Sequence, residues 1–289
     1  MTFCLVFLAH DRGGIGIVSD RRLSTSTTYG DVLVESDDET KVIQLTETSG
    51  IAVAGNVGLL GKLIHGLPSI MSEAVPRKRI ELATKYLSQL YVQTTTEHPV
   101  FQDSAIGASM IIFDTFRRRT SQRYRIKRLA FEFNEQKHRA EVALSGGGNT
   151  DYLTIGASKA LRTQLGIVGA SALFELANRK AEYRQATMVE VENIKAIHKI
   201  DPSAQLFVLD TTLGEPLARA TSSVERNSIG GRALGYTDFL AMAASAAIKH
   251  EVRGMQQKFY LGSFTISPNL HAGVFDVDRG LRLSSSGAD

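Results

Sequence analysis

The sequence predicts an α+β fold in which two β-sheets pack face to face and helices cover their outer faces. Apolar runs of strand length come in groups, and stretches with helical periodicity separate these groups. Several strand-like runs are apolar on both alternating faces, which is typical of strands buried on both sides. Runs of strands separated by runs of helices favour a layered α+β arrangement over alternating βαβ units.

The first expected element is a hairpin at the N-terminus. Residues 2–9, TFCLVFLA, are apolar on both faces, and a turn at 13–14 leads into a second apolar run, IGIVSD. A signal peptide needs a basic region before its apolar core, and no basic residue precedes this run. We therefore expect two strands here rather than a cleaved leader.

The later elements continue this grouping. A second hairpin is expected over 41–45 and 50–56, and two helices over 59–75 and 79–98. The second helix carries an apolar stripe, which consists of Ile80, Ala83, Leu87, Leu90 and Tyr91. The remaining expected elements are strands at 108–114, 128–134, 140–146 and 151–157, helices at 170–184 and 188–199, a strand at 205–210, a helix at 237–255, and strands at 258–266 and 272–277.

Composition is that of an ordinary globular protein, with 289 residues, 43% hydrophobic and 22% charged. The loop at 218–231 predicts a boundary between a main domain, residues 1–221, and a C-terminal extension, residues 222–289, packed on the same domain. The single cysteine, Cys4, excludes an internal disulfide framework and fits a reducing, cytoplasmic location. No apolar run approaches the roughly 20 residues of a membrane helix.

Several functional classes lack support in the sequence. The formal net charge of +3 is too small to argue for nucleic acid or a membrane surface as a partner. Seven histidines are scattered without HExxH or Cys–His spacing, so no metal site is expected. Residues 117–128 carry seven basic side chains, which favour a solvated hairpin between strands over a nucleic-acid patch.

Thr2 would combine a nucleophile and a base in one residue once Met1 is removed. Its hydroxyl can attack a carbonyl carbon while its own α-amine accepts the proton. The reference pKa of an α-amine is about 7.7–8.0, which is close to the optimum for a general base at neutral pH. Threonine is small enough that removal of Met1 is expected. Many inert proteins also begin with Met-Thr, so this reading needs support from other residues.

Three later residues could complete such a site. Asp20 ends the second strand, Lys41 opens the next hairpin, and Gly55 ends a strand just before a helix. A lysine near the amine lowers the pKa of that amine and stabilises an oxyanion, while an aspartate holds the lysine in place. A glycine amide at a helix start can donate to the oxyanion. Taken singly, these residues also fit a surface carboxylate, a solvated lysine and a turn glycine.

The order and spacing of these residues resemble the proteasome β-subunit family of N-terminal nucleophile (Ntn) hydrolases, including its bacterial HslV-type and Anbu-type relatives. The resemblance rests on the terminal Thr, SDRRLS, the lysine of ETKVIQL and the glycine of AVAGN, and it spans residues 2–114. It implies a four-layer αββα sandwich. It also implies these site residues: Thr2 as nucleophile, Asp20 orienting Lys41, Gly55 at the oxyanion, and Ser24 pairing with the substrate backbone.

Beyond residue 114 the resemblance thins. YLTIGAS implies that Gly156 and Ser158 lie near the nucleophile, with Ser145 of ALSGGG as a rival to Ser158. Asp201 and Ser203 match the residues that support the terminal amine, but the glycines expected after the serine are missing. Residues from about 222 onward have no clear counterpart in the family.

The resemblance further implies a threonine endopeptidase that acts on peptides or unfolded proteins within a self-assembled ring or helical array in the cytoplasm. It implies no metal or organic cofactor, no nucleic acid and no membrane as partners, and it leaves an ATPase partner open. Two other functions stay open: a non-catalytic structural subunit with the same fold, and an Ntn amidase that acts on a small molecule.

The same alignment implies a pocket for the side chain that precedes the scissile bond. Its walls are expected to be Leu23, Ile43, Val53 and Val57, with Gly61 at the base and Glu39 near the rim. Apolar walls favour apolar side chains by about 25 cal/mol per Å² buried. We therefore expect preference for Leu, Tyr or Phe at this position, while ordinary core packing is the alternative reading of these residues.

Overall fold

The first of two central sheets joins strands from both ends of the chain. In the computed structural model its order is β10-β1-β2-β13-β14, and every neighbouring pair is antiparallel. The bounds are Tyr152–Gly156 for β10, Phe3–Leu8 for β1, Ile15–Asp20 for β2, Leu270–Asp276 for β13 and Gly280–Ser285 for β14. All but the last residue of β1 is buried, as its apolar faces predict.

The second sheet is a meander of the order β5-β6-β7-β8-β9, again antiparallel throughout. Its strands are β5 (Val42–Thr46), β6 (Ser49–Gly55), β7 (Ala108–Arg118), β8 (Ser121–Asn134) and β9 (Arg139–Ser145). Two further pairs stand apart from both sheets: β3 (Leu23–Ser26) with β4 (Val32–Ser36), and β11 (Tyr183–Gln185) with β12 (Phe207–Leu209).

The structure describes residues 3–9, 14–26, 32–36, 39–104, 106–118, 121–146, 151–156, 159–178, 183–185, 207–209, 236–258, 266, 270–276 and 280–285. The helices are α1 (Val57–Ile64), α2 (Leu67–Glu73), α3 (Arg79–Glu97), α4 (Lys159–Asn178) and α7 (Tyr236–Lys258). Short 3₁₀ turns, η1 (Pro76–Lys78) and η2 (Pro99–Gln102), precede and follow α3.

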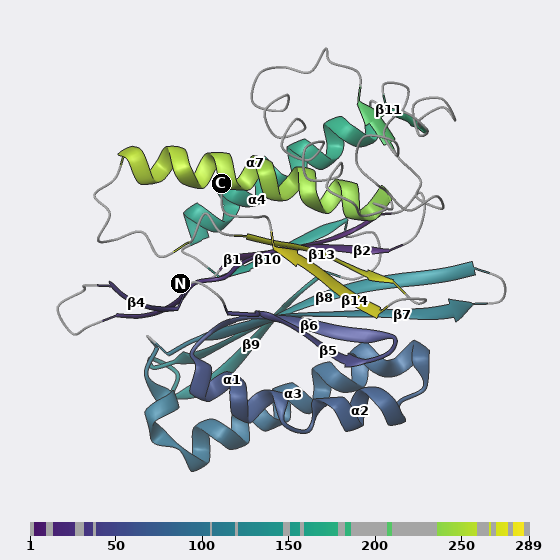
Figure 1. The fold of residues 1–289 in the computed structure, drawn as a ribbon. Coiled ribbons are helices and arrows are strands. Elements are labelled where there is room, and N and C mark those ends of the chain that lie inside the picture. Colours follow the sequence, from purple (N-terminus) through teal and green to yellow (C-terminus); the bar gives the residue numbers. More distant parts are fainter. Residues whose placement is uncertain are drawn as a thin grey trace.

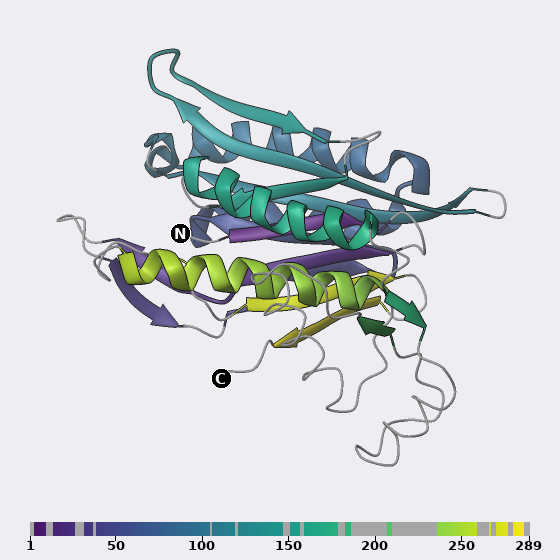
Figure 2. The same ribbon diagram turned by 90° about the horizontal axis from the view of Figure 1, so that it is seen from above.

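Helices cover the outer face of each sheet (Figure 1). The helices α1, α2 and α3 lie against the second sheet, where Leu59, Leu87 and Tyr91 pack on strand residues such as Ile51 and Phe131. The helices α4 and α7 lie side by side over the first sheet (Figure 2). These contacts confirm the predicted mixed fold with two antiparallel sheets and helices.

A third apolar cluster lies between the two sheets. It brings Cys4, Val6 and Ile17 from the first sheet against Ala54 and Ile111 from the second. The predicted stripe of α3 faces inward, because Ile80, Ala83, Leu87 and Tyr91 are buried and Leu90 packs against the same core. Strands such as β1, β2 and β6 are therefore buried on both faces, which explains why they lack a polar face, whereas β5 and β9 carry exposed residues.

The predicted helix at 170–184 is displaced, because α4 begins at Lys159 and ends at Asn178, and residues 183–185 form β11. Gly166 and Gly169 lower the intrinsic helix propensity of the segment before residue 170. The structure gives Gly169 a packing role: a Cβ there would lie 2.8 Å from Leu5 Cδ2 and 3.0 Å from Ile248 Cδ1. A side chain at this position would therefore have to displace the Leu5 and Ile248 side chains of β1 and α7. The helix predicted at 188–199 lies outside the described residues.

Among the residues that the structure describes, no helix is both long and apolar enough to cross a lipid bilayer.

Candidate active site

A buried ion pair joins the two sheets where β1 begins and β2 ends. Lys41 Nζ lies 3.2 Å from Asp20 Oδ1, and the side chains of these residues are 8% and 0% exposed. Lys41 comes directly before β5 of the second sheet, and its ammonium also donates to the carbonyl oxygen of Arg22. The structure therefore brings together the two charged residues that the sequence analysis paired.

The second oxygen of Asp20 accepts a hydrogen bond from the backbone N–H of Phe3, with a distance of 3.1 Å. Phe3 is the first residue of β1 and the first described residue of the chain. Asp20 thus bridges the start of β1 and Lys41. The residue before Phe3 is bonded to the Phe3 nitrogen, and the N–H of this nitrogen contacts the Asp20 carboxylate.

Burial dominates the electrostatics of Asp20. Desolvation raises the pKa of this carboxyl to about 6, although the Lys41 ammonium and the Phe3 N–H oppose the rise. The carboxylate therefore titrates near the lower end of the neutral range. Above pH 6 the pair is ionic, and an ionic pair of this kind can fix an ammonium group beside the start of β1.

Gly55 ends β6 close to the same region of the fold. The backbone N–H of Val53 donates to the carbonyl oxygen of Lys41 at 2.9 Å, which joins β6 to the lysine. Gly55 follows two residues later and has φ of +120°. The helix α1 begins two residues beyond it, and the Asn56 side chain caps this helix by accepting from the N–H of Leu59 at 3.0 Å.

The expected pocket residues occupy contrasting positions. Ile43 on β5 is 37% exposed and Val57 at the start of α1 is 64% exposed, whereas Val53 is buried in the core beneath the helices. Gly61 lies on α1 with open space where a side chain would be. Glu39 is exposed and its N–H donates to the carbonyl oxygen of Arg21. Leu23 and Ser24 lie on β3, and their side chains lie outside the described part of the structure.

Two of the remaining predicted site residues lie at strand ends in different sheets, and the other four lie outside the described residues. Gly156 ends β10 and pairs with Phe3, while Ser145 ends β9 and pairs with Arg128 in the other sheet. The other four, Thr2, Ser158, Asp201 and Ser203, lie outside the described residues. Within the described residues, no group of three or more His, Cys, Asp or Glu side chains is placed to hold a metal ion.

Two residues near this region gave no functional signal in the sequence. His271 on β13 is opposite Ser19, and Ser19 is in turn opposite Cys4. Burial and the Arg21 guanidinium lower the pKa of His271, so this imidazole is held neutral. Only the β13–β2 pairing brings His271 here, and no local pattern in the sequence reveals that pairing. Cys4 itself is fully buried, and burial raises its thiol pKa, so it behaves as a core residue.

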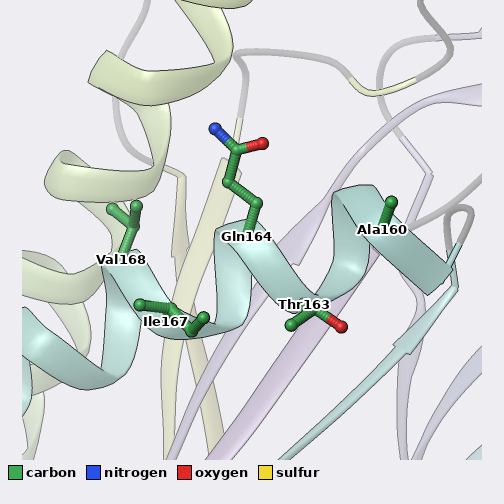
Figure 3. Close-up of a pocket in the computed structure, with 5 residues that line it drawn as sticks. All are labelled: Ala160, Thr163, Gln164, Ile167 and Val168. Carbon is green, nitrogen blue, oxygen red and sulfur yellow. The ribbon is translucent and has the colours of Figure 1, made fainter.

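A separate hollow of about 630 Å³ lies on the outward surface of α4 and is lined by Ala160, Thr163, Gln164, Ile167 and Val168 (Figure 3). Gln164 donates to Glu251 of α7 at 2.8 Å. None of the lining residues carries a charge, and none belongs to the Asp20–Lys41 region. The side chains named here therefore include no acid or base for catalysis.

Comparison with known proteins gives structural neighbours only. No protein-family model and no curated protein matches the chain. Eukaryotic HslV from Trypanosoma brucei is similar at 14% identity with a TM-score of 0.36, over 60% of this chain and 78% of that chain. The Gly-1 mutant of Anbu from Hyphomicrobium sp. strain MC1 is similar at 10% identity with a TM-score of 0.44, over 100% and 88%. These values do not assign the chain to a family.

Proposed function

We propose that this protein is a threonine peptidase of the Ntn-hydrolase type, with a four-layer αββα sandwich and with Thr2 as the nucleophile after removal of Met1. One observation carries the proposal. The Phe3 nitrogen, which is bonded to the carbonyl carbon of Thr2, donates its N–H to the Asp20 carboxylate, and the same carboxylate pairs with Lys41. Packing alone does not require a buried ion pair beside the start of β1.

In the proposed mechanism the Thr2 hydroxyl attacks the scissile carbonyl carbon, and the α-amine of Thr2 takes the hydroxyl proton. The Lys41 ammonium, held by Asp20 and by the Arg22 carbonyl, favours the neutral form of the amine and stabilises developing negative charge. The Gly55 amide, at the end of β6, is assigned to the oxyanion. The amine leaving group accepts the proton, and water then hydrolyses the ester that links the acyl group to Thr2.

The other residues take supporting roles in this proposal. The pairing of Gly156 with Phe3 supports Ser158 over Ser145 as the serine near the nucleophile, since Ser145 ends the edge strand of the other sheet. Asp201 and Ser203 are assigned to support the terminal amine, and Ser24 on β3 to pair with the substrate backbone. Leu23, Ile43, Val53 and Val57 are assigned to the pocket for the residue before the cleaved bond.

We further propose that copies of the chain self-assemble in the cytoplasm into a ring or helical array that encloses the sites and admits peptides or unfolded proteins. No metal or organic cofactor takes part in the proposed chemistry, and no ATPase partner is assigned. Such an enclosure would keep folded proteins away from the sites.

The test is the Thr2→Ala variant, with turnover of fluorogenic peptides and of casein as the readout. We expect loss of all measurable peptidase activity with an unchanged fold, because alanine keeps the α-amine but lacks the hydroxyl. A threonine-directed epoxyketone should label the wild type and not the variant.

Intact mass of the purified protein provides the control. A mass that includes Met1, together with no activity, would replace the proposal with a structural subunit of the same fold. Turnover of small acyl amides in the absence of any cleavage of casein would replace it with a small-molecule amidase.

A further inference from the structure

Two basic segments that are far apart in the sequence meet on the helix side of the second sheet. One runs through η1 into α3, with the sequence PRKR at 76–79, and the other is the basic run of the β7–β8 hairpin. Arg125 of β8 joins them, because its guanidinium donates to the carbonyl oxygens of Arg77 at 2.7 Å and Pro76 at 2.6 Å. The sequence predicted a solvated face for the hairpin alone and gave no sign of this meeting.

A buried aspartate fixes the junction. Asp114 of β7 is fully buried, pairs with Arg125, and lies 3.4 Å from Arg79 at the start of α3. The Arg125 guanidinium also stacks over the Phe116 ring, 4.3 Å from its centre. The hydrogen bonds and ion pairs of Arg125, Arg79 and Asp114 therefore fix the position of η1 relative to β8.

The junction forms one wall of a hollow of about 500 Å³, which we name the basic pocket. Its lining residues are Arg77, Ile80, Glu81, Thr84, Lys85, Arg125, Ile126, Lys127 and Leu144. Four of these side chains are cations and one is a carboxylate. Within the described part of the chain, Arg77, Lys85 and Lys127 have no ion-pair partner. Leu144, on the edge strand β9, is 49% exposed and adds an apolar surface beside these charges.

The chain also carries a compact acidic segment. Residues 31–38, which we name the acidic arm, contain four carboxylates, no cation and three aliphatic residues, in the sequence DVLVESDD. Five of these residues form β4, which pairs with β3 alone and with neither central sheet. In both Figure 1 and Figure 2, β4 lies at one end of the molecule, while β7 ends and β8 begins at the other.

We propose that the acidic arm of one copy binds the basic pocket of a second copy, head to tail. The two surfaces have opposite charge and lie toward opposite ends of the molecule, so they match between copies rather than within one. The aliphatic residues of the arm would contact the apolar surface at Leu144. Because the contact joins two different patches, it repeats from copy to copy and generates a closed ring or an open helical filament.

This inference deepens the self-assembly proposed above and depends on that self-assembly, but it does not depend on the peptidase chemistry. The contact is largely electrostatic, so it should weaken as salt shortens the Debye length from about 10 Å at 0.1 M to about 3 Å at 1 M. Sedimentation velocity at these two salt concentrations measures this directly. We expect the wild type to assemble at the lower concentration and to dissociate substantially at the higher one.

Charge reversal of each surface is the decisive experiment. Arg77→Glu with Lys85→Glu reverses the pocket at two exposed side chains, and Asp31→Lys, Asp37→Lys and Asp38→Lys together reverse the arm. We expect each variant alone to lose assembly, with an apparent dissociation constant at least about tenfold higher. An equimolar mixture of the two variants should assemble again, because each arm then meets a pocket of opposite charge.

The matched control is Lys62→Glu with Lys137→Glu, which makes the same charge change at exposed lysines outside the pocket. This control should assemble like the wild type. Reversed variants that assemble normally, or a mixture that stays monomeric, would overturn the contact. A pocket variant that loses binding of single-stranded DNA while it keeps its assembly would overturn it in favour of a nucleic-acid partner.

The outcomes also separate this contact from the function proposed above. A wild type that stays monomeric at every concentration would overturn both the contact and self-assembly, while the Thr2→Ala measurement still decides the peptidase chemistry. Assembly that survives both reversals would leave self-assembly in place and remove only this contact.

Discussion

At the scale of single residues, Lys41 is the site residue whose size and shape are most constrained by its surroundings. Its ammonium is nearly buried and fits between the Asp20 carboxylate and the Arg22 carbonyl oxygen, which suits a compact charge with freely rotating donors. Arginine is longer and planar, so Lys41→Arg should keep the charge but misplace it. We expect kcat/KM to fall at least about a hundredfold, in line with the loss of other electrostatic groups at about 2.7–4 kcal/mol.

Peptide turnover of Lys41→Arg, measured beside that of Lys62→Arg, checks this expectation. Lys62 is an exposed residue of α1, so its substitution controls for a general effect of arginine. A Lys41→Arg enzyme that retains most of the wild-type rate would show that Lys41 does not act near the reacting atoms.

Asp20 gives a prediction about pH whose sign follows from burial. Its pKa is about 6 in the folded protein against an ordinary value of 3.8 for an aspartate side chain, so the folded state binds more protons between these two values. The contribution of Asp20 to the free energy of unfolding is therefore fully present below about pH 4 and is lost as pH rises through 6. At about 1.4 kcal/mol per pKa unit, the loss is roughly 3 kcal/mol.

Asp20→Asn removes this titration, so the two proteins can be compared by urea denaturation from pH 4 to 7. We expect the stability of the wild type relative to Asp20→Asn to fall across this range. Peptidase activity of the wild type should rise over the same range, because an ionised Asp20 is needed to hold Lys41. A relative stability that rises with pH would contradict the burial argument.

At the scale of elements, the strands and their neighbours were largely predictable from the sequence. The hairpins β1–β2 and β5–β6 follow from local apolar patterns, because their partners are adjacent in the chain. The apolar parts of β7, β8 and β9 were also predictable, but β7 extends to Arg118 and β8 begins at Ser121, so most of the basic run expected as a hairpin between strands is itself strand. The approach of Asp20 to Lys41 was predicted from a resemblance and not from any local rule. Pairings between distant segments, such as β13 with β2, were not predictable, because register between remote strands leaves no local signal.

Gly55 offers a test of how β6 leads into α1. Its φ of +120° lies where side chains are rarely tolerated, and a Cβ there would lie 2.4 Å from the Gly107 carbonyl oxygen. We expect Gly55→Ala to destabilise the protein by about 1–3 kcal/mol, since both strain and a backbone clash act against it. If the Gly55 amide serves the oxyanion, kcat should fall by more than the loss of folded protein explains.

Gly61, six residues later, is the matched control. It lies within α1, and a Cβ there would meet nothing within 4 Å. Gly61→Ala should therefore stabilise the protein by about 0.5–1 kcal/mol through the higher helix propensity of alanine. Thermal unfolding of both variants compares the two glycines, and equal effects would show that φ at Gly55 is not a constraint.

At the scale of the whole molecule, the segment beyond residue 221 is integrated into the first sheet and its helical cover. The strand β13 pairs with β2 along its length, with Leu270 opposite Asp20. The helix α7 buries six side chains in the core over the first sheet, namely Leu240, Ala241, Ala244, Ile248, Val252 and Met255. Gln44 of the second sheet also accepts a hydrogen bond from the N–H of Leu281 at 3.1 Å. The site and this segment thus share the strand β2.

These contacts predict that a chain ending at residue 221 will not fold. Burial of Leu240, Ile248, Val252 and Met255 contributes about 1.5–3 kcal/mol each, or about 6–12 kcal/mol in total. This sum matches the whole stability of a typical domain, about 5–15 kcal/mol. Loss of β13 would also leave one edge of β2 unpaired beside Asp20.

A chain ending at Ser285, which keeps β14 whole, is the control and should unfold cooperatively like the full chain. Circular dichroism and urea denaturation of both chains provide the measurement. A cooperative transition in the 1–221 chain would show instead that residues 222–289 form a dispensable addition.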